Sequence, residues 1–376
     1  MKVLHVSQPV TEGVANWVVD LVGDQLGRGY QTVVACPGAS PLSERVRELG
    51  SEQRDWNASR SPGPSVPSEV LSLRKIVAEV RPDLVHLHSS KAGLAGRLAI
   101  RGSTPTVFQP HGWSFQATSG VLRATTVRWE SFGSRWADRI LCVSEGEAED
   151  AAGIGIRRDR LAVVSNGVDL ERWPAAGAGA REAARERLGL DPVVPLVVNV
   201  GRLSRQKGQD LLLSAWPAVR SAVPGARLYL IGDGPDREAL ATAIGGDSDV
   251  VLHGASRDVP AWLAAADVVV MGSRWEGMSL FVLEAAAAGR SLVVTDVAGM
   301  RDVVGEGPDA AGAVVALEPA GTFASRFGAA VAARLTDAEL RDREAAAART
   351  RVEERFSISR AFDATISLYG LCLSAR

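Results

Sequence analysis

The chain repeats one local pattern, in which a short apolar run, a turn and an amphipathic stretch follow each other. Residues 2–7 and 31–35 are apolar runs of strand length, and residues 14–26 between them carry apolar side chains at helical spacing. A strand, a helix and a second strand in this order form a βαβ unit, the start of a parallel sheet. Further runs of the same kind occur at residues 83–88, 104–109, 139–143 and 161–164. The pattern predicts an α/β fold.

The pattern is interrupted once and then starts again. Residues 166–169, Asn-Gly-Val-Asp, are a turn signal, and small residues at 174–180 form a linker. A second series of strands and helices begins at residue 196 and ends in three helical stretches. Two Rossmann-like domains that face each other across a cleft are therefore expected. We assign residues 1–172 to the first domain, 173–358 to the second, and 359–376 to a terminal helix that packs back on the first.

Composition argues against several classes of protein. The 376 residues are enough for two domains, and the net charge of −2 gives no reason to expect nucleic acid as a partner. The apolar runs are far shorter than a membrane span, and the N-terminus lacks the apolar core of a signal peptide. Cys36, Cys142 and Cys372 are scattered without metal-binding spacing. They are typical of reduced thiols, which predicts a cytoplasmic protein.

Two carboxylates stand eight residues apart in the second series. Glu276 follows a predicted strand at 268–271, and Glu284 lies in a predicted helix at 280–288. Gly277 lets the chain turn, and the amides after it open the helix, where unpaired N–H groups suit a phosphate or a sugar hydroxyl. Taken alone, the two carboxylates are equally compatible with solvated surface charges.

A basic loop follows the first strand of the second series. Gly201 turns the chain, and Arg202 and Lys207 come before the next helix. A guanidinium fork and an ammonium group together match a diphosphate, although a solvated basic loop is an equal alternative. The later turn at residues 232–234, Gly-Asp-Gly, lacks the third glycine of a dinucleotide fingerprint because position 237 is arginine. A nicotinamide enzyme is therefore weakly supported, and no P-loop motif indicates an ATPase.

Histidines are grouped in the first domain. His111 stands beside Gly112 at the end of a predicted strand, where open α/β sheets bind ligands, so it is the best candidate for a catalytic histidine. A structural hydrogen-bonding role is its alternative. His86 and His88 alternate on one strand and so share a face. Strand packing and hydrogen bonding explain them better than a metal site, since no carboxylate or cysteine spacing accompanies them.

The segment 91–139 is basic and carries an apolar stripe. It holds seven cations against two acidic residues, and four large apolar side chains recur at helical spacing, namely Leu122, Trp129, Phe132 and Trp136. A stripe that faces the core is the favoured interpretation. The alternative is a surface for anionic headgroups or a pyrophosphate-bearing lipid.

Together these motifs resemble the family 4 retaining glycosyltransferases of the GT-B fold, over nearly the whole chain. The resemblance lies in an ordered set of segments: Glu12-Gly13, Ser89-Ser90-Lys91-Ala92-Gly93, His111-Gly112-Trp113, Asn166-Gly167-Val168-Asp169, Gly201-Arg202 with Lys207-Gly208, Gly232-Asp233-Gly234, and Glu276 to Glu284, the E-x7-E signature. One departure is visible in the first loop. The family often has two glycines there, and this chain has only Gly13.

The resemblance implies a role for each matching residue. Arg202 and Lys207 would grip the donor diphosphate. Glu284 would hold the ribose hydroxyls, Glu276 would meet a hydroxyl of the donor sugar, and His111 would contact the transferred sugar from the opposite domain. The other implied donor contacts are the loop at Gly13, the base-binding backbone near Ser256 and Arg257, and the amides of Gly277, Met278, Ser279 and Leu280.

The implied activity is transfer of a hexose-type sugar from a nucleotide diphosphate sugar, with a UDP-sugar favoured over GDP-mannose. No D-x-D metal signature is needed if Arg202 and Lys207 neutralise the leaving diphosphate, so we expect no metal and no cofactor. The acceptor is expected to be a lipid-linked glycan, a polysaccharide precursor or a small metabolite, with possible peripheral contact to an anionic membrane at its inner face. A nucleotide-sugar epimerase and a sugar-nucleotide-binding protein without turnover are the alternatives.

Overall fold

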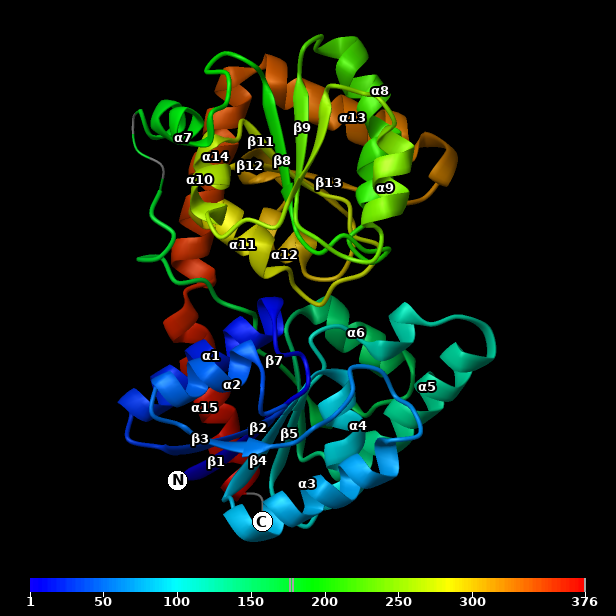
Figure 1. Cartoon of the computed structure of the whole chain (residues 1–376), viewed down its shortest axis with the longest axis vertical. Coiled ribbons are helices and arrows are strands. Elements are labelled where there is room, and N and C mark those ends of the chain that lie inside the picture. Colours follow the sequence, from blue (N-terminus) through cyan, green and yellow to red (C-terminus); the bar gives the residue numbers. More distant parts are fainter. Residues whose placement is uncertain (176, 178, 375–376) are drawn as a thin grey trace. The chain divides into compact units, whose positions relative to one another are not determined.

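The computed structural model describes residues 1–175, 177 and 179–374 (Figure 1). The chain divides into two compact units, the first made of Met1–Ser165 with Ala361–Arg376 and the second of Asn166–Arg360. Each unit holds one parallel sheet with helices on its faces, which is the Rossmann-like arrangement predicted from the alternating pattern.

The first unit contains a seven-stranded sheet in the order β3-β2-β1-β4-β5-β6-β7. Its neighbouring strands pair in parallel. The order reverses between β1 and β4, and loops at the carboxyl ends of these two strands therefore flank the switch point, where open α/β sheets bind ligands. The strands are β1 (Lys2–Ser7), β2 (Gln31–Cys36), β3 (Glu52–Asp55), β4 (Leu84–His88), β5 (Thr106–Gln109), β6 (Arg139–Cys142) and β7 (Leu161–Val163).

Two apolar layers hold the helices of this unit on the sheet. On one face, Leu4 and Val6 of β1 belong to a cluster with side chains of α3 and α4; on the other, Val34 and Cys36 of β2 pack with α1 and α2. The helices are α1 (Glu12–Gly27), α2 (Pro41–Glu48), α3 (Val66–Val80), α4 (Ser89–Ile100), α5 (Gly120–Gly133) and α6 (Glu145–Gly153), with short 3₁₀ turns η1 (Ser114–Ala117), η2 (Ser134–Trp136) and η3 (Arg158–Arg160).

The C-terminal helix α15 (Ile358–Ser374) packs on the first unit, beside α1 (Figure 1). Phe362 lies 5.3 Å from Trp17, measured between ring centroids, and Asp363 forms a 2.7 Å ion pair with Arg28. Tyr369 is fully buried under the sheet. The end of the chain therefore contributes side chains to the core of the domain that begins it.

The second unit contains a six-stranded parallel sheet in the order β10-β9-β8-β11-β12-β13, with its switch point between β8 and β11. Its strands are β8 (Leu196–Val200), β9 (Arg227–Ile231), β10 (Val250–Gly254), β11 (Val268–Met271), β12 (Ser291–Thr295) and β13 (Gly312–Val315). Its helices are α7 (Ala180–Leu188), α8 (Gln209–Ala222), α9 (Arg237–Ile244), α10 (Val259–Ala265), α11 (Leu280–Ala287), α12 (Met300–Val304), α13 (Ala320–Thr336) and α14 (Ala338–Arg355), with η4 (Gly307–Asp309).

The turn at residues 166–169 belongs to the second unit, although the sequence placed it in the first domain. The N–H of Val168 donates to Phe356 O at 2.8 Å, and the N–H of Ile358 donates to Val168 O at 3.1 Å. A Cβ on Gly167 would stand 2.7 Å from the carbonyl oxygen of Ser357, so only glycine lets the two segments lie this close. This backbone contact explains the Asn-Gly pair and moves the boundary to Ser165.

Candidate functional site

Two loops flank the switch point of the second sheet. The first follows β8 and carries Arg202 and Lys207, and the second follows β11 and carries Glu276. The structure brings Lys207 and Glu276 into direct contact, with 2.6 Å between Nζ and Oε1. The same carboxylate oxygen accepts a hydrogen bond from the Ser273 hydroxyl at 2.7 Å. A cation and an anion that sequence reasoning assigned to one ligand are therefore neighbours at the expected edge of the sheet.

Glycines allow the backbones of these loops to touch. Gly208 has a φ of 61°, and a Cβ there would stand 1.9 Å from the oxygen of Gly272. A Cβ on Gly232 would stand 2.0 Å from the oxygen of Gly201. The turn at residues 232–234 thus supports the loop of Arg202 by close backbone packing, and the N–H of Leu203 donates to Asp233 O at 3.0 Å.

The Arg202 guanidinium is half-buried and has no hydrogen bond or ion pair among the residues that the structure describes. Its backbone is fixed, because its carbonyl accepts from Gln209 Nε2 at 3.1 Å. By contrast, Arg274 is held by both carboxylate oxygens of Asp210 at 2.8 and 2.6 Å. Arg202 therefore retains a full set of donors for an anion, whereas the nearby Arg274 is already engaged.

The N-terminus of α11 adds neutral donors to the same loop. Ser279 is the N-cap residue, its side chain makes no capping bond, and its buried hydroxyl has no partner within the described ranges. Gly277 and Met278 precede it, and Met278 O accepts from Asn166 Nδ2 at 3.0 Å. Leu280 opens the helix, so its amide belongs to the unpaired set of the first turn. A buried hydroxyl without a partner beside such amides is what a bound polar ligand would satisfy.

Glu284 lies one turn further along α11. It is the half-buried acidic residue of a helix whose other side chains are mostly buried and apolar. Ser256 and Arg257 stand apart from this group, on the loop after the edge strand β10. The Ser256 hydroxyl accepts from the N–H of Asp258 at 3.1 Å, while Arg257 is exposed.

In the first unit, the loop after β1 contains a strained residue. Glu12 has a φ of 63°, a left-handed conformation that costs a non-glycine residue about 1 kcal/mol. Gly13 follows it in the first turn of α1. The position of the absent second glycine is therefore filled by a residue that adopts a glycine-like backbone, and the loop keeps its turn.

His111 also has a left-handed backbone, with a φ of 54°, and Gly112 follows with 99°. This turn is held by Glu147 of α6, whose Oε1 accepts from the N–H of Gly112 at 2.6 Å and whose Oε2 accepts from the N–H of Val143 at 2.7 Å. Burial raises the pKa of the Glu147 carboxyl to about 7. Sequence analysis did not single out Glu147; its one signal was the Ser144-x-x-Glu147 spacing of a helix start.

The His111 ring is desolvated, which lowers its pKa to about 3, so the imidazole is neutral near pH 7. Its Nε2 lies 3.3 Å from Nδ1 of His88, at the end of β4. His86 Nδ1 lies 2.6 Å from the Tyr369 hydroxyl. The predicted hydrogen bonding of His86 and His88 is therefore confirmed.

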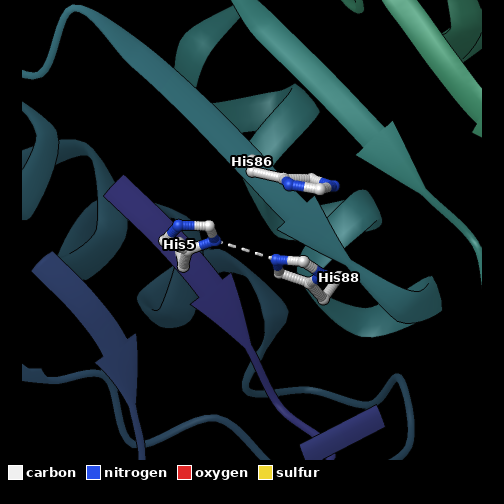
Figure 2. A group of neighbouring side chains, drawn as sticks. All are labelled: His5, His86 and His88. Atoms are coloured by element: carbon white, nitrogen blue, oxygen red, sulfur yellow. Dashed lines mark hydrogen bonds between the residues drawn. The ribbon is translucent and has the colours of Figure 1, made fainter. Parts of the chain in front are cut away.

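His5, His86 and His88 project from the same face of β1 and β4 (Figure 2). One ring nitrogen from each of the three lies within 4.8 Å of those of the other two, and all three side chains are buried. Sequence analysis missed His5 because it considered only the pair on one strand.

The favoured prediction that the apolar stripe of the basic segment faces the core is wrong for Leu122 and Phe132, which are exposed, while Trp129 and Trp136 are partly buried. Leu122 is 62% and Phe132 45% exposed, and Val121 at the start of α5 is 85% exposed. Two of the seven cations are internal: Lys91 forms a 2.6 Å pair with buried Glu69, and Arg97 a 2.7 Å pair with buried Glu130. The reason is that α5 rests on α4 through only a narrow edge, where Glu130 and Gly133 are its buried residues. The remaining surface of α5 is both apolar and basic.

Two Rossmann-like sheets, with a cation–carboxylate pair and a helix N-terminus at one switch point, form an arrangement that suits a phosphorylated nucleotide ligand. Residues 11–172 match the family model described as Glycosyltransferase Family 4, and residues 194–337 match that of Glycosyl transferases group 1. The chain belongs to the family 4 glycosyltransferases and has the GT-B fold.

Relatives with known activities support this assignment. The GDP-mannose-dependent alpha-mannosyltransferase of Mycobacterium tuberculosis is 30% identical over 337 residues, which cover 86% of this chain and 84% of the relative. The UDP-Gal:alpha-D-GlcNAc-diphosphoundecaprenol alpha-1,3-galactosyltransferase of Escherichia coli is 30% identical over 246 residues, 62% of this chain and 63% of the relative. The crystal structure of Anabaena HepE in complex with UDP-glucose has the same fold, with a TM-score of 0.83 at 20% identity and complete coverage of both chains.

Proposed function

We propose that this protein is a retaining glycosyltransferase that moves a hexose-type sugar from a UDP-sugar to a glycan, lipid-linked or small-molecule acceptor. The observation that carries the proposal is the arrangement at the second switch point. There, Lys207 pairs with Glu276 at 2.6 Å, Arg202 keeps its donors, and the Ser279 hydroxyl lacks a partner in the described chain. This set offers two cations, one carboxylate and neutral donors to one nucleotide diphosphate sugar.

Arg202 and Lys207 bind the donor diphosphate in this proposal. Charge develops on the leaving nucleoside diphosphate in the transition state, and fixed cations stabilise it without reorganisation. The amides of Gly277, Met278, Ser279 and Leu280 add neutral donors at a helix N-terminus. This cationic and dipolar set supports a reaction in which no metal ion neutralises the diphosphate.

The remaining roles follow the chemistry of each group. Glu284 accepts hydrogen bonds from the ribose hydroxyls, since a carboxylate accepts two at once. Glu276 accepts from a hydroxyl of the donor sugar. Ser256 and Arg257 hold the base. His111, in its neutral form, contacts the transferred sugar in this proposal, and Gly13 contacts the donor.

The identity of the donor base is inferred from the relatives. The galactosyltransferase relative uses a UDP-sugar by name and HepE was crystallised with UDP-glucose, whereas the mannosyltransferase relative is named for GDP-mannose. Calorimetric titration with UDP-glucose, UDP-galactose and GDP-mannose decides between them. The proposal expects binding of a UDP-sugar at least about tenfold tighter than GDP-mannose, a difference of about 1.4 kcal/mol. Tighter binding of GDP-mannose would overturn the base assignment.

We also propose that α5 brings the enzyme to an anionic membrane. None of the helices that the structure describes combines the length and apolar content needed to traverse a bilayer. Contact would therefore be peripheral, through the exposed Val121, Leu122 and Phe132 and the exposed Arg123, Arg128 and Arg135. Each such cation contributes about 1 kcal/mol near an anionic surface, so binding should be weak and sensitive to salt.

Cosedimentation with vesicles tests this contact. The wild-type protein should sediment with anionic vesicles at low salt and not with neutral ones. A variant with Arg123, Arg128 and Arg135 changed to Glu should lose binding, while a control with the exposed Arg227, Arg343 and Arg360 changed to Glu has the same net charge and should retain most of it. Equal behaviour of the two variants would remove the membrane proposal and leave the transferase proposal untouched.

A lipid-linked acceptor fits such a contact and fits the E. coli relative, whose name contains a diphosphoundecaprenol acceptor. We place the enzyme in the cytoplasm at the inner membrane face, which agrees with three buried cysteines, Cys36, Cys142 and Cys372, that form no disulfide in the described chain. Release of nucleoside diphosphate separates the alternatives: a transferase releases it in proportion to acceptor, while an epimerase converts the sugar without an acceptor and a binding protein does neither.

A further inference from the structure

A continuous line of buried hydrogen bonds runs from the C-terminal helix to His111. Gln25 Nε2 donates to the Tyr369 hydroxyl at 3.4 Å, and Gln25 Oε1 lies 2.8 Å from His5 Nε2. His5 Nδ1 lies 3.1 Å from His88 Nε2, the step drawn in Figure 2. His88 Nδ1 then lies 3.3 Å from His111 Nε2. The line thus connects residues that are far apart in sequence, on α15, α1, β1 and β4, and it ends at one candidate catalytic side chain.

The fold explains why these groups meet. β1 and β4 are neighbours across the switch point, and Ser7 pairs with His88, so His5 and His88 share a face two residues apart in register. The helices α1 and α15 cover that face, and their Gln25 and Tyr369 are fully buried. Buried polar groups must form hydrogen bonds with one another, so these groups form one line. Its side chains are Tyr369, Gln25, His5 and His88.

The line of hydrogen bonds determines which nitrogen of each histidine ring carries the proton. Burial lowers the pKa of His5 to about 4 and that of His88 well below its ordinary value, so both rings are neutral and each has one donor and one acceptor. Because Gln25 Oε1 can only accept, His5 donates from Nε2 and accepts at Nδ1. His88 must then donate from Nε2 and accept at Nδ1. His111 therefore donates from Nε2, and its Nδ1 carries no proton.

We propose that Tyr369, Gln25, His5 and His88 are positioning residues that hold His111 in the Nε2–H tautomer, with Nδ1 as an acceptor for a hydroxyl of the transferred sugar. This inference rests on the proposed function, since it needs a hydroxylated ligand at His111. It adds that the terminal helix α15 helps to complete the site, because Tyr369 is the group that faces the amide nitrogen of Gln25.

The orientation of Gln25 decides the direction of the whole line. If its amide were turned, His5 would accept at Nε2, every proton would reverse, and His111 would carry Nδ1–H instead. The Gln25 orientation in the structure opposes this, because Nε2 donates to the Tyr369 hydroxyl, which can in turn donate to His86 Nδ1 at 2.6 Å when that nitrogen carries no proton. Loss of that hydroxyl should therefore give a mixture of proteins in which the hydrogen bonds of the line run in one direction or the other.

A metal ion bound by His5, His86 and His88 is the competing use of these side chains. Both nitrogens of His5 and of His88 already lie within hydrogen-bond distance of partners. A cation would break the line, and the described cluster offers no anionic ligand to offset the burial of its charge. The hydrogen-bonded line satisfies more of the observed contacts than the metal site does.

Tautomers can be measured directly in the intact protein with ¹⁵N-labelled histidine, by long-range ¹H–¹⁵N correlation spectra. The chain has five histidines, so a His111→Gln variant identifies the His111 signals by their absence. The wild-type protein should show His111 as the Nε2–H tautomer. The Nδ1–H tautomer, or a doubly protonated ring at pH 7, would overturn the proposal, and this result does not depend on the identity of the donor.

The Tyr369→Phe variant tests the line itself, with Thr365→Val as the matched control. Thr365 is buried on the same helix, but the one partner of its hydroxyl within the described residues is Ala361 O of α15. In Tyr369→Phe, His111 should show both tautomers and kcat should fall about three- to tenfold with little change in the donor KM, since only one population is competent. The control should keep the wild-type spectrum and kcat. A single unchanged tautomer in Tyr369→Phe would overturn the line.

Two further outcomes separate this inference from its alternatives. Equimolar zinc should leave the histidine signals of the intact protein unchanged, and a stoichiometric complex that shifts His5, His86 and His88 together would overturn the line in favour of a metal site. If the wild-type protein turns over no nucleotide sugar, the proposed function fails, while the tautomer spectrum still reports whether the line orients His111.

Discussion

Replacement of Glu147 by Gln should change how the stability of the protein depends on pH. The folded protein raises the pKa of this carboxyl from 4.5 to about 7, chiefly through burial. Below pH 4.5 the group is protonated in both states and has no effect. As pH rises from 4.5 to 7, the Glu147 carboxyl ionises in the unfolded chain before it ionises in the folded protein, so the free energy of unfolding falls. Above pH 7 the carboxyl is ionised in both states and the free energy of unfolding falls no further. The shift corresponds to about 3 kcal/mol.

In the Glu147→Gln variant the new side chain would be neutral at every pH, so this penalty disappears. The wild-type Glu147 accepts hydrogen bonds from the N–H groups of Gly112 and Val143. The Gln side chain of the variant can accept only one of them, because its NH₂ group would face the other N–H group. That misfit costs about 1–3 kcal/mol at all pH values. The variant should therefore be less stable than the wild type at pH 5 and about equally stable at pH 8.

The assay is urea unfolding of the two proteins side by side between pH 5 and 8, because other titrating groups cancel in the difference. The stability difference between variant and wild type should change by about 2.5 kcal/mol across that range, in favour of the variant at high pH. A difference that stays constant within about 0.5 kcal/mol would refute the claim that burial makes the Glu147 carboxylate costly.

Three further predictions concern the donor site. Arg202→Ala should lower kcat about a hundredfold without loss of stability, because the guanidinium has no partner in the described chain; wild-type turnover at saturating donor would contradict this. Glu284→Gln should weaken donor binding by about 1.5–3 kcal/mol, and a 2′,3′-dideoxyribose donor should lose little more in that variant; additive losses would show that the carboxylate acts elsewhere. Activity should persist in excess chelator, and complete loss restored by magnesium or manganese would contradict a metal-free diphosphate site.

Much of the fold could be predicted because parallel strands buried on both faces read as continuous apolar runs. Residues 196–200, predicted as a strand, are β8 in the structure. The edge strand β3 was not predicted, because its sequence, Glu-Gln-Arg-Asp, has no apolar residue and half of its side chains are exposed. Helix α7 was also not predicted, for a similar reason, since its residues 180–188 are mostly polar and adjoin a linker rich in alanine and glycine.

The donor-side motifs were visible because each is contiguous in the chain. Glu276 and Lys207 are brought together by neighbouring strands β8 and β11, as the α/β pattern predicts. The line that ends at His111 could not be predicted. The terminal helix was expected to pack back on the first domain, but Tyr369 and Gln25 are 344 residues apart and no local pattern indicates that these two side chains meet.

The central claim is that the charges at the second switch point drive transfer from a nucleotide diphosphate sugar. The most direct measurement is release of UDP from UDP-glucose and UDP-galactose in chelator, with a lipid-diphosphate-linked sugar as acceptor, by the wild-type protein and by Lys207→Ala. The account predicts acceptor-dependent release with one of the two donors, lowered about a hundredfold in the variant, and a product with the α configuration of the donor. Equal release by both proteins, or a product of inverted configuration, would contradict it.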